Sequence, residues 1–422
     1  MAIRKVLTLL VCFYNLAFAQ YNLNYFINKA SENSPVIKEY GNLYLMNGLQ
    51  NDLDKAQNSA FQVYLSSNIL LSPYFNNNGV PFTANPNPNA IGYDAAITNG
   101  GLYSSQINVE KNIFNSGLLD ALSEQRQAQG KSYENKSHQE KHAVEKQVTD
   151  QYLSALQYLL LYKLSKEIEE NLQKQLAITG DLVAKGYTKT QDYLLLNIEI
   201  KSQTIEMDQS WQNYRTGLMQ LYSICGLRDT QTVILDTVQL KPTVTKPGSD
   251  FLTQYYLDSL SAASQQRAFE TRYLPQVNVF FNAGLNAVEL SGIQRKFGLS
   301  AGLNLSLPIL DGGQKSITRQ QTYLSEQSLS DYKTFLAGRI VTWRYDAENK
   351  TVSLRKNLNE MKEQISDYKK LLELSQNQLQ HGDISMIDYL TLLKNYVDLQ
   401  KNNITAEINY QLGINDYNYW NW

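Results

Sequence analysis

The same short pattern of residues occurs twice in this chain of 422 residues, 196 positions apart. The stretch "AKGYTKTQDYL" contains Gly186 and Asp192, and "QHGDISMIDYL" contains Gly382 and Asp388 at the equivalent places. The same offset relates "INVEKNIFNSG" to "LNLSLPILDGG", and no insertion separates these landmarks. Each half is therefore one long unit of fixed geometry. This indicates a duplicated helix-strand-strand-long helix-helix unit rather than a solenoid of short repeats.

Each half contains two segments in which apolar and polar residues alternate, as in a strand with two different faces. In the last of them, Phe, Leu, Ala, Leu, Leu and Leu alternate with Gly, Ser, Gly, Asn and Ser. Runs of about ten alternating residues fit strands that cross an outer-membrane bilayer, but a half-buried soluble sheet alternates in the same way. On alternation alone, the soluble sheet is the simpler interpretation. The predicted strands are about 61–75, 102–112, 276–288 and 297–308.

A very long helical segment follows the second strand of each half. Residues 118–182 contain no Pro, and a helix of roughly 65 residues would be on the order of 100 Å long. Apolar residues stand at every fourth position from Leu156 to Leu176. Such a stripe winds around a helix, so this helix must meet neighbours on more than one side. The predicted helices are about 118–184, 188–225, 314–380 and 385–418, with 227–245 as the linker between repeats 20–226 and 246–422.

The repeated pattern stands where each long helix must stop and return. Gly186 and Gly382 can adopt the left-handed conformation that ends a helix. Thr188 and Ser385 can then cap the returning helices. We therefore expect two helical hairpin tips, both at the same end of the molecule.

The first 19 residues have the pattern of a secretory signal peptide. Arg4 and Lys5 precede a short apolar run, and Ala17-Phe18-Ala19 resembles a cleavage site. The only cysteine of the sequence outside this segment, Cys225, has no partner for an internal disulfide and stands among apolar residues. This predicts a buried thiol. A formal net charge of −2 predicts no basic surface for nucleic acid. No later segment has 18 consecutive apolar residues, so no membrane-spanning helix is expected.

The number of strands has a consequence if the sheet lies in a membrane. Four strands leave two open edges whose backbone groups lipid cannot satisfy, and single-chain barrels begin at eight strands. Several copies of the chain would have to close one barrel together. Their long helices would then close a second cylinder on the same axis.

This organisation resembles the TolC family of outer-membrane efflux proteins over nearly the whole mature chain. The residues that carry the resemblance are "ASENSPVI" from Ala30, "RYLPQV" before the third strand, "PILDGG" after the fourth, and the two tips. The resemblance implies an α+β membrane protein of the bacterial outer membrane: a homotrimer with a 12-stranded β-barrel continuous with a long periplasmic α-helical barrel. It implies a passive exit duct without enzymatic activity or cofactor. Its partners would be an inner-membrane transporter and a periplasmic adaptor protein that contacts the tips at Gly186, Thr188, Gly382 and Ser385.

The resemblance also predicts a gate of acidic residues near the tips. Asp388 matches one acid of the family pattern, and Asp192 is its equivalent in the first half. The next acid of that pattern falls on Thr391, and an arginine near the tip falls on Ile384, so a network of gate ion pairs is not expected. Three Asp388 side chains around a threefold axis would attract cations. The alternative is that both acids simply stabilise the first turn of a helix.

Other candidate sites are weaker. His138 and His142 are four residues apart on a helix, but no third metal ligand follows, and a solvated helix face is the simpler interpretation. No phosphate-binding loop or nucleophile motif is present, so no enzyme is predicted. Two functions remain open: an outer-membrane channel serving either a small-solute pump or a protein secretion system, and a secreted soluble helical spacer or adhesin.

Overall fold

The computed structural model describes residues 21–77, 80–83, 91, 101–244 and 247–422. The predicted signal peptide lies outside these residues. The chain forms two compact units, each of which takes residues from both halves of the sequence. Unit 1 comprises residues up to Tyr40, Asn135–Thr253 and Lys333–Trp422, and unit 2 comprises Gly41–Glu134 and Gln254–Tyr332. The compact units therefore do not coincide with the predicted repeats.

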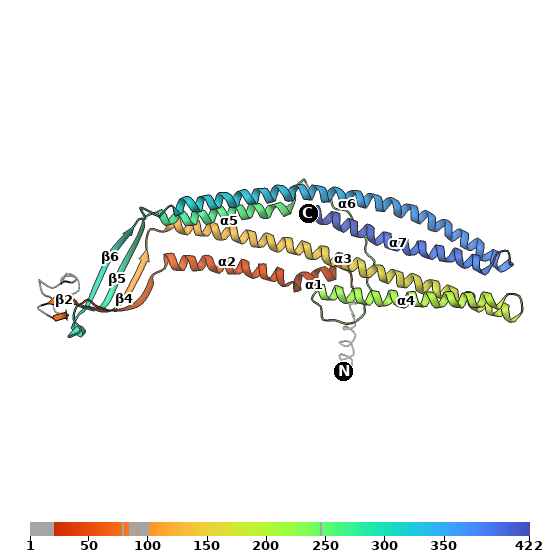
Figure 1. Cartoon of the computed structure of the whole chain (residues 1–422), viewed down its shortest axis with the longest axis horizontal. Coiled ribbons are helices and arrows are strands. Elements are labelled where there is room, and N and C mark those ends of the chain that lie inside the picture. Colours follow the sequence, from red (N-terminus) through yellow and green to blue (C-terminus); the bar gives the residue numbers. More distant parts are fainter. Residues whose placement is uncertain (1–20, 78–79, 84–90, 92–100, 245–246) are drawn as a thin grey trace, which may run out of the picture. The chain divides into compact units, whose positions relative to one another are not determined.

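Unit 2 contains a four-stranded antiparallel sheet in the order β1-β4-β5-β6 (Figure 1). The strands are β1 Gln62–Leu71, β4 Gly101–Asn112, β5 Gln276–Ala287 and β6 Phe297–Ser306. The two strands of each half pair with each other, and β4 pairs with β5 to join the halves. Strands β1 and β6 are the edges of this sheet.

The first strand is shorter than the predicted segment 61–75. Strand β1 ends at Leu71, and Pro73 follows two residues later. Proline has no N–H for a ladder hydrogen bond, which fits the end of β1 two residues before Pro73. The chain then forms a separate two-stranded sheet from β2, Tyr74–Asn77, and β3, Val80–Thr83.

Helices account for most of the remaining described residues. Helices α3 and α6 are the long ones, with 69 and 68 residues. Helix α6 begins directly after the segment "PILDGG", and α3 begins inside the corresponding segment of the first half. Both contribute residues to each unit. None of the helices described is long and apolar enough to cross a membrane. The helices are α1 Leu23–Asn33, α2 Pro35–Ser59, α3 Ser116–Ala184, α4 Thr190–Ile224, α5 Thr253–Glu270, α6 Gln314–His381 and α7 Met386–Trp420, with short 3-10 helices at Asp250–Leu252, Thr271–Tyr273 and Ile293–Arg295.

Unit 1 has two clusters of buried apolar side chains, and the long stripe on α3 contributes to both. Leu156 belongs to the first cluster, with residues of α1, α4 and the linker after α4. Leu164, Ile168 and Leu172 belong to the second, with residues of α4 and α7. The winding stripe predicted from the four-residue spacing therefore does meet different neighbours along the helix.

Three buried tyrosines hold the segment that follows α4, which we call the strap (residues 231–236). The hydroxyl groups of Tyr152, Tyr214 and Tyr222 donate hydrogen bonds to backbone carbonyl groups of the strap, at Asp236, Val233 and Gln231 respectively. The Tyr214 hydroxyl also accepts from the N–H of Leu235. Burial raises the pKa of Tyr214 and that of Tyr222 to about 12, so both phenols stay protonated donors.

Cys225 directly follows α4 and belongs to the first apolar cluster of unit 1. Its side chain is fully buried. Its thiol donates to the carbonyl oxygen of Phe26 at 3.4 Å, and burial raises its pKa to about 12. A thiol that remains protonated and inaccessible is unreactive. The sequence-based prediction of a core cysteine is confirmed.

The helices of unit 2 are connected mainly by polar contacts. Asp54 on α2 is only 7% exposed and accepts from Arg126 on α3 at 2.8 Å and from Gln50 at 2.9 Å. Asp258 on α5 accepts from Ser132 on α3 at 3.1 Å. These helices therefore lie side by side without the apolar clusters that unit 1 has among the described residues.

The strap provides a test of this packing. We expect Tyr214→Phe to lower the free energy of unfolding by about 1–3 kcal/mol, because the carbonyl of Val233 and the buried N–H of Leu235 both lose their partner. Thermal unfolding followed by circular dichroism in detergent measures the change. Tyr187→Phe is the control, because Tyr187 is 77% exposed and should tolerate the change. Equal stability of the two variants would contradict this role of the strap.

Candidate functional site

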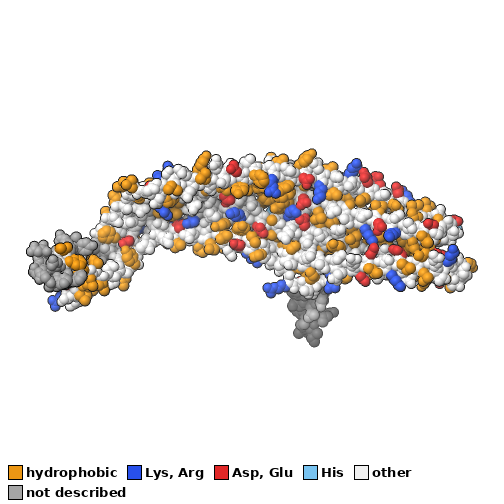
Figure 2. Space-filling view, in the orientation of Figure 1, with side chains coloured by type: hydrophobic (Ala, Val, Ile, Leu, Met, Phe, Trp, Pro, Cys, Tyr) orange, Lys and Arg blue, Asp and Glu red, His pale blue; other side chains and the backbone are white. Residues whose placement is uncertain are grey.

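The four-stranded sheet has one continuous apolar face. Residues that pair across the strands place Leu65, Ile107, Ala283 and Leu299 in one row. The row on one side is similar, and the row on the other side has serines in β1 and β4 and apolar residues in β5 and β6. Much of this face is open: Leu65 is 71% exposed and Leu299 is 66% exposed. Figure 2 shows hydrophobic side chains gathered over the strands. Its large exposed members are Val63, Leu65, Ile69, Leu71, Ile107, Phe281, Phe297, Leu299, Leu303 and Leu305.

The opposite face of the sheet is polar but almost uncharged. Its rows include Asn108, Asn282 and Ser300 side by side. Asn108 donates to the hydroxyl of Ser66 at 2.7 Å, and the Tyr64 hydroxyl donates to Glu110 at 2.6 Å. An apolar exposed face backed by a face of amides and hydroxyls is the pattern of strands that separate lipid from water.

Charges in these strands are confined to one place. Among the residues of β1, β4, β5 and β6, the only charged ones are Glu110 and Lys111, adjacent near the end of β4. Glu110 lies on the polar face, and Lys111 lies on the apolar face opposite Val279. The apolar face therefore has a charge only at its margin.

A phenylalanine ring packs closely over a glycine on the polar face. A Cβ atom at Gly302 would lie 2.4 Å from the ring of Phe280 on the neighbouring strand. The ring thus covers Gly302 and occupies space that any other side chain would need. This explains a small residue in the middle of an otherwise regular strand.

A groove of about 980 Å³ lies between helices of unit 2 and is lined mainly by polar side chains. Arg126 borders it but is already paired with Asp54. The groove has no group of acids, cysteines and histidines, and no such group that could hold a metal ion exists among the described residues. Its other polar lining residues include Gln125, Gln265, Gln266, Thr318, Gln321 and Thr322.

The two hairpin tips have the same backbone geometry. At the first, Gly186 has φ 77°, its N–H donates to Val183, and the N–H of Tyr187 donates to Leu182. At the second, Gly382 has φ 79°. The N–H of Gly382 donates to Leu379, and the N–H of Asp383 donates to Gln378. This pair of bonds is the Schellman motif, so the predicted left-handed glycines end both long helices. Both tips lie at the same end of unit 1 (Figure 1).

The capping of the returning helices differs between the tips. Ser385 is the N-cap of α7, as predicted: its hydroxyl accepts from the N–H of Asp388 at 3.2 Å, and Asp388 completes a capping box. Thr188 does not cap α4, because the N-cap is Lys189, which lies one residue further on and whose side chain makes no capping bond. Thr188 instead donates to the carboxylate of Asp192 at 2.9 Å. This corrects the sequence-based assignment of Thr188.

The two candidate gate acids lie in the first turn of their helices. The carboxylate of Asp388 accepts from the Ser385 hydroxyl at 2.7 Å and remains exposed, and Asp192 is half-buried. Thr391 donates to the carbonyl of Ile387, and Ile384 packs against the second apolar cluster. The positions where the family pattern has a further acid and an arginine thus serve local structure here. In this structure, Asp388 caps the start of α7 together with Ser385.

Side chains between the hairpins join them near the tips. Met386 and Tyr389 of α7 are buried in the second cluster with Leu196 of α4. Gln175 of α3 donates to the Tyr389 hydroxyl at 3.1 Å, and Lys401 pairs with Glu206 further along. The two hairpins therefore pack against each other behind their tips.

Of the two histidines considered as metal ligands, His138 is exposed and His142 packs among aromatic rings. The ring of His142 stacks between those of Tyr419, at 4.9 Å, and Trp422, at 4.5 Å. Its Nε2 lies 3.0 Å from the carbonyl oxygen of Tyr419. This side chain packs the C-terminal end of the chain. The aromatic stack could not be predicted from the four-residue spacing of His138 and His142.

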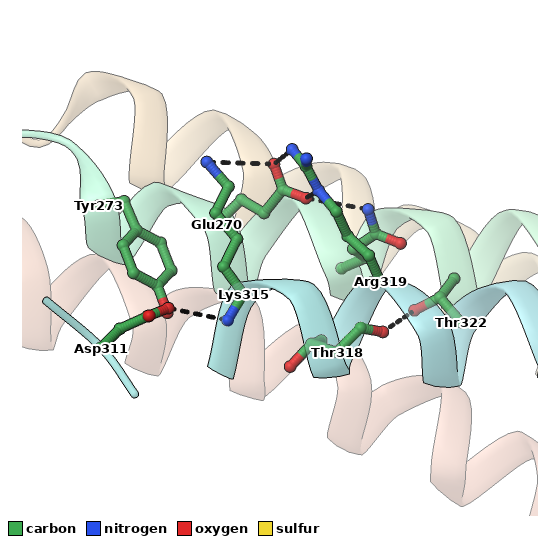
Figure 3. A network of polar contacts seen from close by, with 8 residues as sticks. Glu270, Tyr273, Asp311, Lys315, Thr318, Arg319 and Thr322 are labelled. Atoms are coloured by element: carbon green, nitrogen blue, oxygen red, sulfur yellow. Dashed lines mark hydrogen bonds and ion pairs between the residues drawn. The ribbon is translucent and has the colours of Figure 1, made fainter. Parts of the chain in front are cut away.

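A polar network, not predicted from the sequence, joins the end of α5 to the start of α6 (Figure 3). Arg319 donates two hydrogen bonds to Glu270, at 2.7 and 2.9 Å, and these bonds hold the pKa of Glu270 at about 2. Asp311 accepts from the Tyr273 hydroxyl at 2.7 Å and from the N–H of Lys315 at 2.8 Å. The only sequence signal was "LDGG", whose Asp and glycines permit this sharp start of a helix.

Comparisons with known proteins identify the fold. The sequence matches no family model and no curated protein. Solved structures match over almost the whole chain. CusC, described in relation to folding and transmembrane channel formation, is 12% identical with a TM-score of 0.72, and the match covers 96% of this chain and 92% of CusC.

Two further structures agree. The CmeC outer membrane channel of Campylobacter jejuni is 14% identical with a TM-score of 0.70, covering 94% of this chain and 85% of CmeC. The outer membrane protein VceC of Vibrio cholerae is 13% identical with a TM-score of 0.70, covering 94% and 96% of the two chains. The chain therefore has the fold of these outer-membrane proteins, which confirms at the level of fold the resemblance predicted from the sequence.

The different capping of the two tips leads to a prediction. Ser385→Ala should destabilise the first turn of α7 by about 1 kcal/mol, because it removes an N-cap hydrogen bond. Thr188→Ala should have a smaller effect on α4, since Thr188 bonds no backbone N–H there. Amide hydrogen exchange of residues 386–392 and 190–196 measures both changes. Equal loss of protection at the two tips would contradict the assignment.

Proposed function

We propose that this chain, which has the fold of outer-membrane channel proteins, is itself an outer-membrane channel of the TolC family. Three copies would close a 12-stranded β-barrel in the bacterial outer membrane, and their helices would form an α-helical barrel in the periplasm. The channel would serve as the passive exit duct of a tripartite efflux or secretion system driven by an inner-membrane transporter. The two halves of the chain would descend from one duplicated unit.

The observation that carries this proposal is the two-faced sheet with open edges. Leu303 and Leu305 are 70% and 68% exposed on the apolar face, a surface that water disfavours and lipid accepts. Strands β1 and β6 each leave one row of backbone groups without a partner strand in the sheet. Pairing β6 of one copy with β1 of the next satisfies these groups and leaves no edge.

The helices support the same assembly. Leu45 and Leu49 of α2 are 64% and 69% exposed, and Tyr345 and Val352 of α6 are 68% and 64% exposed. Exposed apolar residues four or seven positions apart lie on one side of a helix. We assign these sides to contacts with neighbouring copies in the helical barrel.

The tips are the proposed contact for a periplasmic adaptor. Gly186 and Gly382 are exposed, and the surface around Thr188 and Ser385 includes Tyr187, which is 77% exposed. A large exposed aromatic side chain on a structured turn is suited to a protein contact. No nucleic-acid or cofactor role is proposed for this surface.

The alternative function is a secreted soluble spacer or adhesin. It requires the apolar face of the sheet to face water, which is unfavourable for so many exposed leucines. The channel is therefore the better-supported function.

The assembly can be tested directly. We expect the purified protein to require detergent for extraction from washed envelopes, to give trimers on chemical cross-linking, and to produce discrete conductance steps in planar bilayers. Heat-denatured protein is the control for conductance. A monomer that dissolves in buffer and gives no conductance would exclude the channel and favour the spacer.

The gate proposal needs its own variant. If Asp388 faces the pore, three copies create a ring of carboxylates, and Asp388→Ala should weaken the block of single-channel current by multivalent cations. Ser385→Ala is the matched control, because it breaks the same capping box without removing a charge. Unchanged block in Asp388→Ala would restrict Asp388 to helix capping. Asp192→Ala tests the second candidate in the same way.

A further inference from the structure

The polar face of the sheet carries one carboxylate with an aromatic residue on each side of it. Among the residues of β1, β4, β5 and β6, Glu110 is the one charged side chain of this face. It pairs across the ladder with Phe280 of β5. From the other side, the hydroxyl of Tyr64 on β1 donates to the Glu110 carboxylate at 2.6 Å. We call Tyr64, Glu110 and Phe280 the Glu110 row.

The side chains beside Glu110 in the strands do not neutralise its charge. Lys111 lies on the opposite face, where its Nζ is 4.6 Å from the ring centroid of Phe61. Gln62, directly across from Glu110 in β1, donates its amide to the carbonyl of Ala56 at 2.9 Å. The strands therefore present one uncompensated negative charge on a face that otherwise consists mainly of amides and hydroxyls.

The two aromatic rings leave the carboxylate accessible. The ring of Phe280 leans away from Glu110 and covers Gly302 on the far side of β5. It therefore does not fill the space above the ladder between β4 and β5. Tyr64 is 46% exposed, and Glu110 and Phe280 are half-buried. A solute can reach all three side chains from the same face of the sheet.

This combination of groups is suited to an organic cation. The face of an aromatic ring attracts an ammonium group, and a carboxylate supplies the opposite charge. Directly opposite side chains in a sheet have Cβ atoms about 5 Å apart, so a small molecule can contact Glu110 and Phe280 together. A calcium ion needs six or more oxygen ligands, whereas this row offers one carboxylate and one phenol. The row therefore fits an ammonium group better than a metal ion.

We propose that the Glu110 row binds organic cations that carry an aromatic or other apolar group. The ammonium group lies against Glu110 and the ring of Tyr64, and the apolar group lies on the ring of Phe280. One copy of the sheet is sufficient for this contact. In the proposed trimer, three rows would lie at one level of the barrel interior and slow the passage of such cations. That last consequence rests on the proposed function.

Binding of benzyltrimethylammonium to the purified full chain in uncharged detergent tests the row. Saturation-transfer NMR titrations give the dissociation constant. We expect it to rise about fivefold in Glu110→Gln, which loses the charge, and about threefold in Phe280→Leu, which loses the ring. Leucine keeps an apolar side chain beside the sheet, and glutamine has the shape of glutamate, so both variants should fold.

Two substitutions of the same kind serve as controls. Glu289→Gln removes an exposed acid two residues beyond the end of β5. Phe281→Leu removes a ring from the apolar face, where Phe281 pairs with Val109. Both should bind the cation as the wild type does. A wild type without binding, an unchanged affinity in Glu110→Gln, or an equal loss in the controls would overturn the row.

Tyr64 distinguishes a site for organic cations from a simple negative charge. Tyr64→Phe keeps the ring and should retain binding, whereas Tyr64→Leu should weaken it about threefold. Potassium at the same concentration should compete poorly, because it gains little from the two rings. If potassium competes equally well and Tyr64→Leu binds normally, the row is a bare charge and the proposal is rejected.

Conductance separates this proposal from the channel itself. Benzyltrimethylammonium should reduce the single-channel current of the wild type more than that of Glu110→Gln. A protein that conducts normally but binds no organic cation rejects only the row. A protein that binds the cation with the expected dependence on Glu110 and Phe280, but gives no conductance, supports the row and rejects the channel.

Discussion

An exposed apolar sheet with two unpaired edges is the constraint on which the rest of this structure depends. The apolar face costs free energy in water, and the unpaired backbone groups of the edges cost free energy in lipid, so neither medium suits a single chain. In the proposed assembly, lipid on one face, water on the other and a sister strand at each edge would remove both costs at once. The long helices, the polar contacts between them and their exposed apolar sides are consistent with a wall that becomes complete only in an assembly.

The hairpin ends show how the chain returns without a large core. Each long helix stops at a left-handed glycine whose neighbours satisfy the last carbonyl groups. The hairpins are then joined by a modest cluster that includes Leu172, Met386 and Tyr389. Local backbone geometry fixes the turn, and packing fixes which hairpins lie together.

Much of the secondary structure could be predicted because its signals are local. Alternation located the strands, the absence of Pro located the long helices, and Gly186 and Gly382 located their ends. Thr188 was misassigned because the backbone, not the residue type, decides which position begins a helix. The Glu270–Arg319 pair joins residues 49 positions apart, and sequence spacing carries no information about such a contact. Likewise, nothing distinguishes the three strap-binding residues among the 29 tyrosines of the chain.

The strap illustrates how attachment and variability can coexist. Tyr152, Tyr214 and Tyr222 recognise its carbonyl groups, which every amino acid possesses. Substitutions at the exposed strap positions, such as Thr232 and Ile234, therefore leave its anchoring bonds intact, whereas a change in the tyrosines, or at the buried Leu235, does not. The exposed side of this segment should therefore vary among related sequences far more than the helices beneath it. Its surface chemistry can change while the segment stays attached.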